Sequence, residues 1–364
     1  MKEDEKFMGK ALLLARKAEG RTRPNPLVGA LVVKNSRIVG KGFHKKAGES
    51  HGEIEALAIA RNKARGATLY TTMEPCTHWG RTGPCTEAII AHGIRRVVIG
   101  SIDPNPLVSG KGVRALRRAS VEVTLNVLAD EARRINEAYF SFMRTGRPFV
   151  IMKAAVSMDG RIATGSGESQ WISGEEARAF AHRLRQRADA VMVGIGTILK
   201  DDPLLTVRYG MGNDIMPYRV IVDSSLRIPD SARVLRHEPW MTVIATTRRA
   251  PEKKKERLLS IGVEVLTLPS SRGTVNLRAL LNELGKRGIQ GLLVEGGARI
   301  FASLMKDRLV NKAFIILAPM LLGEGVPLFR GWGVKRLKDG PVLKRVRVMR
   351  LGRDLVVEGY LSEN

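Results

Sequence analysis

The first 146 residues alternate between helix-like and strand-like patterns of apolar positions. Apolar residues at three- and four-residue spacing predict helices over 5–19, 53–63, 85–92, 110–118 and 130–143. Short apolar runs predict strands over 28–33, 38–43, 67–72, 96–100 and 121–125. We expect Leu12, Leu13 and Ala15 to face inward, and Asn35-Ser36 to join the first two strands in a hairpin-like connection. Five strands with helices on both faces predict a three-layer α/β/α sandwich.

A second pattern begins after Gly146, where Gly146 and Pro148 mark a helix end. The predicted domains are therefore 1–146 and 147–364. In the second domain, buried strands are predicted at 149–155, 190–193, 219–222, 242–245, 263–266, 291–294, 312–317 and near the C-terminus. Helices predicted between them, for example at 174–186 and 277–286, imply a mostly parallel sheet with helical crossovers.

Composition narrows the function only slightly. A length of 364 residues suits two domains, and the net charge of +25 is spread over both. Diffuse positive charge attracts nucleic acid, but it also suits anionic substrates and cofactors, or simply a solvated basic surface. An aromatic content of 5% argues against base-stacking surfaces; although composition alone does not decide among these partners, no nucleic-acid partner is expected. The charged N-terminus and the short apolar runs predict a cytoplasmic protein with no membrane contact.

The most informative segment lies between residues 51 and 85. His51, Cys76 and Cys85 offer one imidazole and two thiolates, and these are the two cysteines of the chain. Three such ligands leave an open position on zinc, which is typical of a catalytic site. Glu53 lies close enough in sequence to move protons beside the metal without ligating it. The alternatives are ordinary buried thiols or a disulfide, and the latter is rare in the cytosol.

The flanking elements favour the catalytic interpretation. His51 and Glu53 stand at the start of one predicted helix, and Pro84 suits the first turn of the helix that begins at Cys85. Helix N-termini favour thiolate over thiol. Zinc lowers the pKa of bound water toward neutrality, so hydroxide can attack an amidine-like ring carbon while Glu53 carries the proton to the leaving amine.

Two Gly-containing turns, at 193–197 and 294–298, follow predicted strands of the second domain and run into helices. Amides exposed at such junctions bind phosphate oxygens. Neither turn has the Rossmann fingerprint, and a single one is as often a tight turn. Two of them at carboxyl ends of strands in one sheet favour a nucleotide cofactor.

Along nearly its whole length the chain resembles the bifunctional riboflavin-biosynthesis enzymes, in which a pyrimidine deaminase is fused to a reductase. The deaminase half of the resemblance is carried by 24–29, His44, 51–53, 74–78, 80–82, 84–85 and 103–106. The reductase half is carried by 157–161, 167–172, 201–208 and 294–297. The resemblance implies a cytidine-deaminase-like domain followed by a dihydrofolate-reductase-like domain. It implies deamination of a diaminopyrimidine bearing a ribosylamino 5-phosphate, then NADPH-dependent reduction of the ribosyl group to ribityl.

The same resemblance implies roles for individual residues. The deaminase substrate would be surrounded by Asn25, His44, Arg81, Asp103 and Asn105. The reductase substrate would contact Ser169, Arg185, Leu205, Arg208 and Glu295. NADPH would be held by Ala155, Trp171, Thr197, Asp201, Ser224, Gly297, Ala298, Arg299, Ile300, Phe301, Ala302 and Ser303. A homodimer through the reductase domain is also expected from the resemblance.

Residue chemistry supports part of this picture. The guanidinium forks of Arg185 and Arg208 suit a phosphate, although in so basic a chain a surface ion pair is the better explanation for either one alone. Lys153 and Glu295 are candidates for the reductase acid/base, and Lys153 is the one we select. Gly52 departs from the family's usual alanine, and because glycine is a poor helix former we expect a looser helix start with no ligand moved.

Three other functions stay open at this point. A deaminase acting on tRNA or free nucleosides would share the zinc site but leave the second domain unexplained. A basic nucleic-acid-binding protein would need a closed, four-ligand zinc, and no fourth ligand is evident nearby. A chain with one inactive domain would also fit, although the motifs of both halves are intact.

Overall fold

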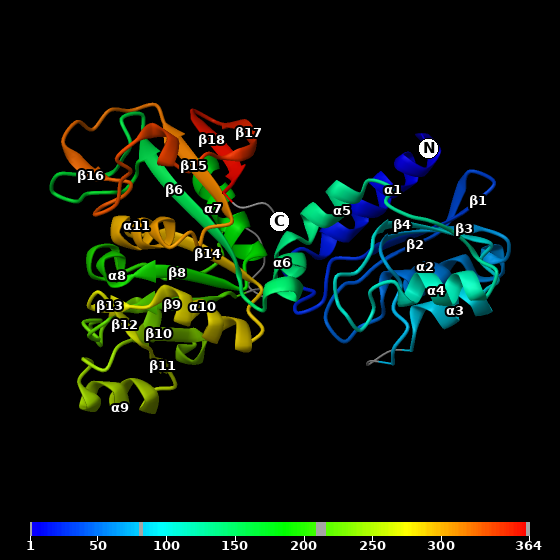
Figure 1. Ribbon diagram of the computed structural model, residues 1–364, viewed down its shortest axis with the longest axis horizontal. Helices are drawn as coiled ribbons and strands as arrows, with labels where there is room; N and C mark the ends of the chain where they lie inside the picture. The colour runs from blue at the N-terminus through cyan, green and yellow to red at the C-terminus, as the bar shows by residue number, and fades with distance from the viewer. Residues whose placement is uncertain (1, 80–82, 209–215, 362–364) are drawn as a thin grey trace. The chain divides into compact units, whose positions relative to one another are not determined.

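The computed structural model describes residues 2–79, 83–208 and 216–361 and divides the chain into two compact units, Met1–Gly146 and Arg147–Asn364. Figure 1 shows the elements of both units, and each unit is described here by itself. Among the described residues, none of the helices has the length and apolar character needed to cross a membrane.

Unit 1 contains, within its described residues, one five-stranded sheet with the order β2-β1-β3-β4-β5. The strands are β1 (Gly29–Lys34), β2 (Arg37–Phe43), β3 (Thr68–Met73), β4 (Arg96–Ser101) and β5 (Glu122–Thr124). The helices are α1 (Lys2–Ala15), α2 (Gly52–Ala60), α3 (Cys85–Ala91), α4 (Lys111–Arg118), α5 (Ala129–Ile135) and α6 (Glu137–Thr145), with 3-10 turns η1 (Arg16–Ala18) and η2 (Arg61–Ala64). Strand β1 pairs antiparallel with β2 and β3, whereas β3, β4 and β5 run parallel.

Each face of this sheet carries its own apolar core, which confirms the three-layer prediction. Helices α2, α3 and α4 cover one face, where Leu57, Ile89 and Leu116 are buried. Helices α1 and α5 cover the other, where Met8 and Ala132 are buried. Helices cover both faces of the sheet, so the central strands β1, β3 and β4 are buried along almost their whole length and do not alternate between buried and exposed residues.

Glycines allow α2 to lie directly on β2. A Cβ added to Gly42 would stand 2.3 Å from the carbonyl oxygen of Gly52, and one added to Gly40 would stand 2.1 Å from that of Ala56. No side chain fits in this space, so the two backbones are in contact. This close approach fixes the start of α2, where His51 and Glu53 lie, relative to the sheet.

Three details of the predicted elements in unit 1 were wrong. Leu13 is 67% exposed, although Leu12 and Ala15 are buried as expected. The helix predicted over 53–63 ends at Ala60 and continues as η2, and Ile59 faces solvent. The helix predicted over 130–143 is two helices, broken at Asn136. By contrast, Asn35 and Ser36 have positive φ angles of 50° and 56°, as a tight hairpin turn requires.

Unit 2 contains, in the part of the chain that the structure describes, a nine-stranded sheet with the order β11-β10-β9-β8-β14-β6-β15-β18-β17. Its strands are β6 (Phe149–Ser157), β8 (Ala190–Gly194), β9 (Tyr218–Val222), β10 (Thr242–Thr246), β11 (Glu264–Thr267), β14 (Gly291–Gly296), β15 (Lys312–Ala318), β17 (Lys344–Leu351) and β18 (Asp354–Tyr360). The first seven run parallel, and β18 and β17 add antiparallel at one edge. The predicted, mostly parallel sheet is confirmed.

Helices cover both faces of the second sheet. They are α7 (Glu175–Arg187), α8 (Ile195–Asp201), α9 (Glu252–Ser260), α10 (Leu277–Lys286) and α11 (Ala298–Lys306), with 3-10 turns η3 (Arg233–Leu235), η4 (Pro239–Met241) and η5 (Leu337–Asp339). Leucines of α10 and Phe301 of α11 pack on one face, and α7, α8 and α9 pack on the other. Two small ribbons, β12 (Ser270–Ser271) with β13 (Thr274–Val275) and β7 (Arg161–Thr164) with β16 (Gly325–Pro327), lie outside this sheet.

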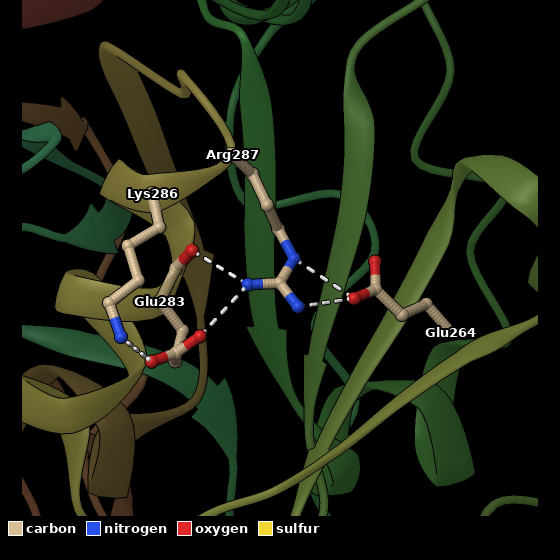
Figure 2. A network of polar contacts seen from close by, with 4 residues as sticks. All are labelled: Glu264, Glu283, Lys286 and Arg287. Atoms are coloured by element: carbon tan, nitrogen blue, oxygen red, sulfur yellow. Dashed lines mark hydrogen bonds and ion pairs between the residues drawn. The ribbon is translucent and has the colours of Figure 1, made fainter.

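A surface network ties the end of α10 to the edge strand β11 (Figure 2). Arg287, the residue that ends α10, donates from Nε to Glu264 Oε1 over 2.9 Å and from Nη1 to Glu283 Oε2 over 3.2 Å. Lys286 donates to the other oxygen of Glu283 over 2.7 Å. The network restrains β11, which within the described part of the chain is the edge strand of the sheet beyond β10.

Candidate functional sites

The three predicted zinc ligands meet at the helix ends of unit 1. His51 is the residue before α2, Cys76 lies in the loop after β3, and Cys85 is the first residue of α3. Their donor atoms all lie within 4.8 Å of one another, and both cysteines are free thiols. Among the described residues this is the one such cluster of three. The disulfide alternative is therefore wrong.

The geometry also identifies the ligating nitrogen, which the sequence left open. His51 Nδ1 lies 3.1 Å from Cys85 Sγ and 3.6 Å from Cys76 Sγ. The amide of Cys85, at the start of α3, donates to Cys76 Sγ over 3.4 Å. The Cys85 thiol contact, followed by the His51 contact, lowers the pKa of Cys76 to about 4, so this sulfur is anionic at neutral pH. One nitrogen and two sulfurs at this spacing match a zinc donor set, and they leave a coordination position open.

Glu53 lies beside the ligands without belonging to their set. Its Oε2 is 3.8 Å from Cys85 Sγ, and its Oε1 accepts a hydrogen bond from Thr71 Oγ1 over 3.0 Å. The side chain is almost fully buried, and burial raises the pKa of its carboxyl group. The Glu53 carboxylate therefore comes from the first turn of α2, and the hydrogen bond from Thr71 on β3 orients it.

Asn25 and His44 form a second polar pair near the zinc ligands. Asn25 Nδ2 lies 3.1 Å from His44 Nε2, and His44 Nδ1 lies 3.1 Å from the carbonyl of Ser50. A carbonyl only accepts, so Nδ1 carries the proton and Nε2 accepts from the amide. Burial lowers the pKa of His44, which agrees with a neutral ring. The His44 and His51 rings stand edge to face, with centroids 5.4 Å apart.

Asp103 and Asn105 lie on a loop that a buried carboxylate fixes. Glu74 accepts from the backbone amides of Gly110 over 2.9 Å and Val113 over 3.1 Å, which caps the start of α4. Asp103 Oδ1 accepts from the amide of Asn105 over 2.8 Å. The loop 103–110 is thus attached to the residue two positions before Cys76. Arg81 lies outside the described residues.

The unusual Gly52 occupies a tight position. An added Cβ would stand 3.0 Å from the carbonyl oxygen of Val28 and 3.2 Å from Cα of Phe43. An alanine here requires the neighbouring backbone to move by a few tenths of an ångström. The glycine therefore keeps α2 close to the strand–loop junction at Val28.

In unit 2, a cavity of about 1180 Å³ opens where the parallel strands end. Both predicted Gly-containing turns line it: β8 runs through Gly194 into α8, and β14 runs through Gly297 into α11. These strands are neighbours in the sheet. An added Cβ on Gly296 would stand 3.1 Å from Thr197 Oγ1, so the two turns are in contact. Both turns therefore line the same cavity.

A cluster of charged residues lines one part of this cavity. Arg185 on α7 donates from Nε and Nη2 to Oε2 of Glu295 on β14, over 2.9 Å and 2.6 Å. Its Nη1 donates to the carbonyl oxygen of Thr206. Lys153 on β6 also lines the cavity, and burial lowers the pKa of its amine while the nearby Glu295 raises it. Arg185 is therefore already paired with Glu295, and only the guanidinium N–H groups outside these contacts remain to bind an anionic ligand.

Most other predicted reductase residues also line the cavity. They are Ser169, Leu205, Arg208, Ala155, Trp171, Thr197, Asp201, Ser224, Gly297, Ala298, Arg299, Ile300, Phe301 and Ser303. Ser169 donates to Asp201 over 3.3 Å, and Arg178 stacks 4.8 Å above the exposed ring of Trp171. Ala302 is buried behind the cavity wall and is not among the lining residues.

Several cavity residues were missed by the sequence analysis. His182 accepts at Nδ1 from the amide of Arg208 over 3.0 Å, and it precedes Arg185 by one helical turn on α7. That spacing could have identified it, because residues three apart on a helix share a face. Arg227, Arg233 and Arg330 also line the cavity and carry no comparable local signal.

Comparison with known proteins identifies the family to which each unit belongs. Residues 148–357 match the RibD C-terminal domain family, and residues 1–101 match the cytidine and deoxycytidylate deaminase zinc-binding region. The chain is 45% identical to the riboflavin biosynthesis protein RibD of Aquifex aeolicus over 97% of each chain. It is 38% identical to the Escherichia coli protein of the same name, over 97% of this chain and 98% of the other.

Solved structures agree over the full length. The Acinetobacter baumannii RibD structure superposes with a TM-score of 0.91 at 35% identity, covering 100% of this chain and 99% of the other. The diaminohydroxyphosphoribosylaminopyrimidine deaminase/5-amino-6-(5-phosphoribosylamino)uracil reductase of Thermotoga maritima gives 0.87 at 36%, covering 99% of each. The predicted fold classes, a cytidine-deaminase-like domain followed by a dihydrofolate-reductase-like domain, are confirmed. The chain therefore belongs to the RibD family of riboflavin biosynthesis, with a zinc-binding deaminase unit followed by an NADPH-using reductase unit.

Proposed function

We propose that unit 1 deaminates 2,5-diamino-6-(5-phosphoribosylamino)pyrimidin-4-one and that unit 2 reduces the ribosyl side chain of the product to ribityl. The final product would be 5-amino-6-(5-phosphoribitylamino)uracil. The observation that carries the first step is the arrangement of His51, Cys76 and Cys85 with the Glu53 carboxylate 3.8 Å from Cys85 Sγ. The name of the Thermotoga maritima relative supports the choice of substrate.

Glu53 would carry protons in the deamination. Zinc, when bound by the three ligands, activates a water molecule for attack on the ring carbon. The Glu53 carboxylate accepts a hydrogen bond from Thr71 and is shielded from bulk solvent. It would accept the proton that the attacking water releases and deliver it to the departing amine. Its position beside the donor set, but outside it, supports this role.

The pyrimidine would be read by the polar groups around the metal. Asn25 and His44 form one hydrogen-bonded pair there, and Asp103 and Asn105 form another on the opposite loop. The neutral amide and imidazole groups, together with the Asp103 carboxylate, suit the donors and acceptors of a diaminopyrimidine edge. Arg81 would contact the substrate, a role supported by the resemblance alone.

In unit 2, NADPH would lie across the two Gly-containing turns and supply hydride to the sugar. Amides at the starts of α8 and α11 would bind its phosphates, with Thr197 and the segment 297–303 around them. Ala155, Trp171, Asp201 and Ser224 would complete the cofactor site.

The reductase substrate would lie against the charged cluster. Arg208 and the free donors of Arg185 would bind the phosphate, and Ser169, Leu205 and Glu295 would position the sugar and base. Lys153 would donate the proton that balances hydride addition. Its support is its place in the cavity wall beside Glu295, which keeps a positive charge in a buried position.

We also propose a homodimer through unit 2, acting in the cytoplasm. Strand β17 ends the nine-stranded sheet, and Val346 and Val348 on it are 50% and 63% exposed. Among the described residues β17 is an edge strand that alternates basic and apolar side chains, and the family resemblance supports its use in a contact between two copies.

Product analysis by mass spectrometry tests the two reactions together. The phosphorylated diaminopyrimidine should exchange an amine for a carbonyl without NADPH, and gain two hydrogens only when NADPH is added. Cytidine and a tRNA serve as comparison substrates. Turnover of either one, with none of the diaminopyrimidine, contradicts the proposal, and light scattering of the same sample measures the oligomeric state.

A further inference from the structure

Helix α6 presents two buried polar side chains to two different substrate loops. Asn136 is the residue that precedes the helix, and Tyr139 lies three positions after Asn136, in the first turn of α6. They are 5% and 6% exposed. Neither belongs to the zinc site or to the residues implied by the family resemblance.

Asn136 holds the loop that carries Asn25. Its Oδ1 accepts from the amide of Leu27 over 2.7 Å, and its Nδ2 donates to the carbonyl of Leu27 over 2.9 Å. The primary amide of Asn136 supplies both the acceptor and the donor that the backbone N–H and C=O of Leu27 need, as a neighbouring strand would in a sheet. The adjoining Val28 carbonyl accepts the amide of His44 over 2.9 Å. The Asn136 side chain thus holds the backbone at Leu27, which lies between Asn25 and the residue that bonds to His44.

Tyr139 holds the opposite loop. Its hydroxyl donates to Asp103 Oδ1 over 2.9 Å, the same oxygen that accepts the amide of Asn105. Burial and the carboxylate raise the pKa of Tyr139, so the phenol stays protonated and remains a donor. Asp103 can then turn its second oxygen toward a ligand while the first is occupied.

The helix itself is shaped for this contact. The preceding helix α5 stops at Ile135, and Asn136 has φ −119° and ψ 22°, outside the helical region. This break redirects the chain so that α6 points both polar groups at the loops. A continuous helix over 130–143, which the sequence pattern favoured, would not leave the Asn136 backbone in this conformation.

We infer that Asn136 and Tyr139 are positioning residues of the deaminase, which clamp the loops at 24–28 and 103–106 to one helix so that the pyrimidine-reading groups stay at a fixed separation. The inference rests on the proposed function for the roles of Asn25 and Asp103. It assigns to α6 an effect on substrate affinity, separate from metal binding and proton transfer.

The test uses Tyr139→Phe and Asn136→Ala in the full-length zinc-loaded enzyme. Tyr70→Phe is the matched control, because Tyr70 is equally buried and donates to the Asp4 carboxylate over the same 2.9 Å, far from the substrate loops in the hydrogen-bond network. For each variant we would measure zinc content, deaminase KM and kcat, reductase rate on the deaminated intermediate, and backbone hydrogen exchange.

The expected result is a KM about tenfold higher in Tyr139→Phe and Asn136→Ala, since each loses hydrogen bonds in a buried setting, with zinc content and reductase rate unchanged. The kcat should change by less than KM. Exchange should accelerate at 25–28 in Asn136→Ala and at 103–106 in Tyr139→Phe. The Tyr70→Phe control should leave KM and both exchange patterns as in the wild type.

Two results overturn the inference. One is unchanged exchange at both loops in both variants, which needs no substrate and so decides the clamp even if the diaminopyrimidine proves inert and the proposed function fails. The other is an equal change of KM in Tyr70→Phe and Tyr139→Phe, because this indicates a general loss of stability rather than positioning.

Discussion

The zinc centre and the reductase cavity differ in how the chain assembles them. The zinc ligands and Glu53 lie between residues 51 and 85, on two helix starts and one loop. The cavity is lined by residues that range from Lys153 to Arg330 and come from most elements of unit 2. A site with few groups of specific chemistry should fail completely when one is changed. A site with many contacts should lose function by degrees.

The first prediction tests the concentrated site. Glu53→Gln keeps the shape of the side chain and the Thr71 hydrogen bond but cannot accept a proton. Deaminase kcat should fall by about 10³–10⁴, because proton transfer is lost while zinc binding is not. Zinc content measured by atomic absorption should stay as in the wild type, and reduction of the deaminated intermediate is the internal control. Deamination at a near-normal rate would remove Glu53 from its proposed role.

The second prediction tests the distributed site. Lys153→Met removes the buried amine beside Glu295 and should lower reductase kcat by about 10² at neutral pH. The decrease is smaller than that in the deaminase, since hydride transfer still proceeds with a proton from solvent. Arg178→Met, which changes a stacking contact of Trp171 at the cavity wall, is the control and should chiefly affect the KM for NADPH. A normal pH–rate profile in Lys153→Met would show that another group donates the proton.

The third prediction concerns the support of the zinc centre. Gly42→Ala places a Cβ 2.3 Å from the Gly52 carbonyl oxygen, so α2 must move away from β2. We expect a loss of about 3 kcal/mol in the unfolding free energy of unit 1, together with weaker zinc binding. Gly333→Ala is the control, because nothing lies within 4 Å of its added Cβ. If Gly42→Ala binds zinc as tightly as the wild type, the backbone contact does not position His51.

These differences also explain what the sequence could and could not predict. His51, Cys76 and Cys85 were identifiable because each side chain has one chemical use and their spacing fits the flanking helices. The parallel strands were identifiable because both sheet faces are covered and the strands read as continuous apolar runs.

What the sequence could not predict depends on contacts between distant residues. The helix break at Asn136 follows from its hydrogen bonds to Leu27, and the helical pattern over 130–143 contains no sign of them. In the same way, nothing local identifies Arg185 as the partner of Glu295. Leu13 is apolar, as a core residue would be, but its position on α1 faces solvent.

The fourth prediction concerns the charge balance of the cavity. Burial, and then Arg185 and Arg208, lower the pKa of His182 to about 4 from an ordinary 6.5, with Glu295 acting in the opposite direction and Lys153 in the same one. As pH falls from about 6.5 toward 4, protons bind the unfolded chain and not the folded one, so stability is lost in that window and is unaffected above it.

The matched variant is His182→Asn, whose side-chain oxygen can still accept the Arg208 amide. Between pH 7 and pH 5, the wild type should lose about 2 kcal/mol more unfolding free energy than this variant, as measured by urea denaturation. Parallel loss in the two proteins would mean that His182 is protonated in the folded state as easily as in the unfolded chain.

The last prediction concerns a charged network outside both sites. Arg287 makes the same fork-like contacts with Glu264 and Glu283 that Arg185 makes with Glu295, but its side chain is 31% exposed and that of Glu264 is 41% exposed (Figure 2). Water screens these charges, so Arg287→Ala should cost less than about 1 kcal/mol, and the cost should shrink further in about 1 M salt. Urea denaturation at low and high salt measures both quantities. A cost above 2 kcal/mol that is independent of salt would mean that guanidinium geometry, and not burial, sets the strength of the ion pairs in unit 2. In that case the Arg185–Glu295 pair would not owe its strength to its burial in the cavity wall.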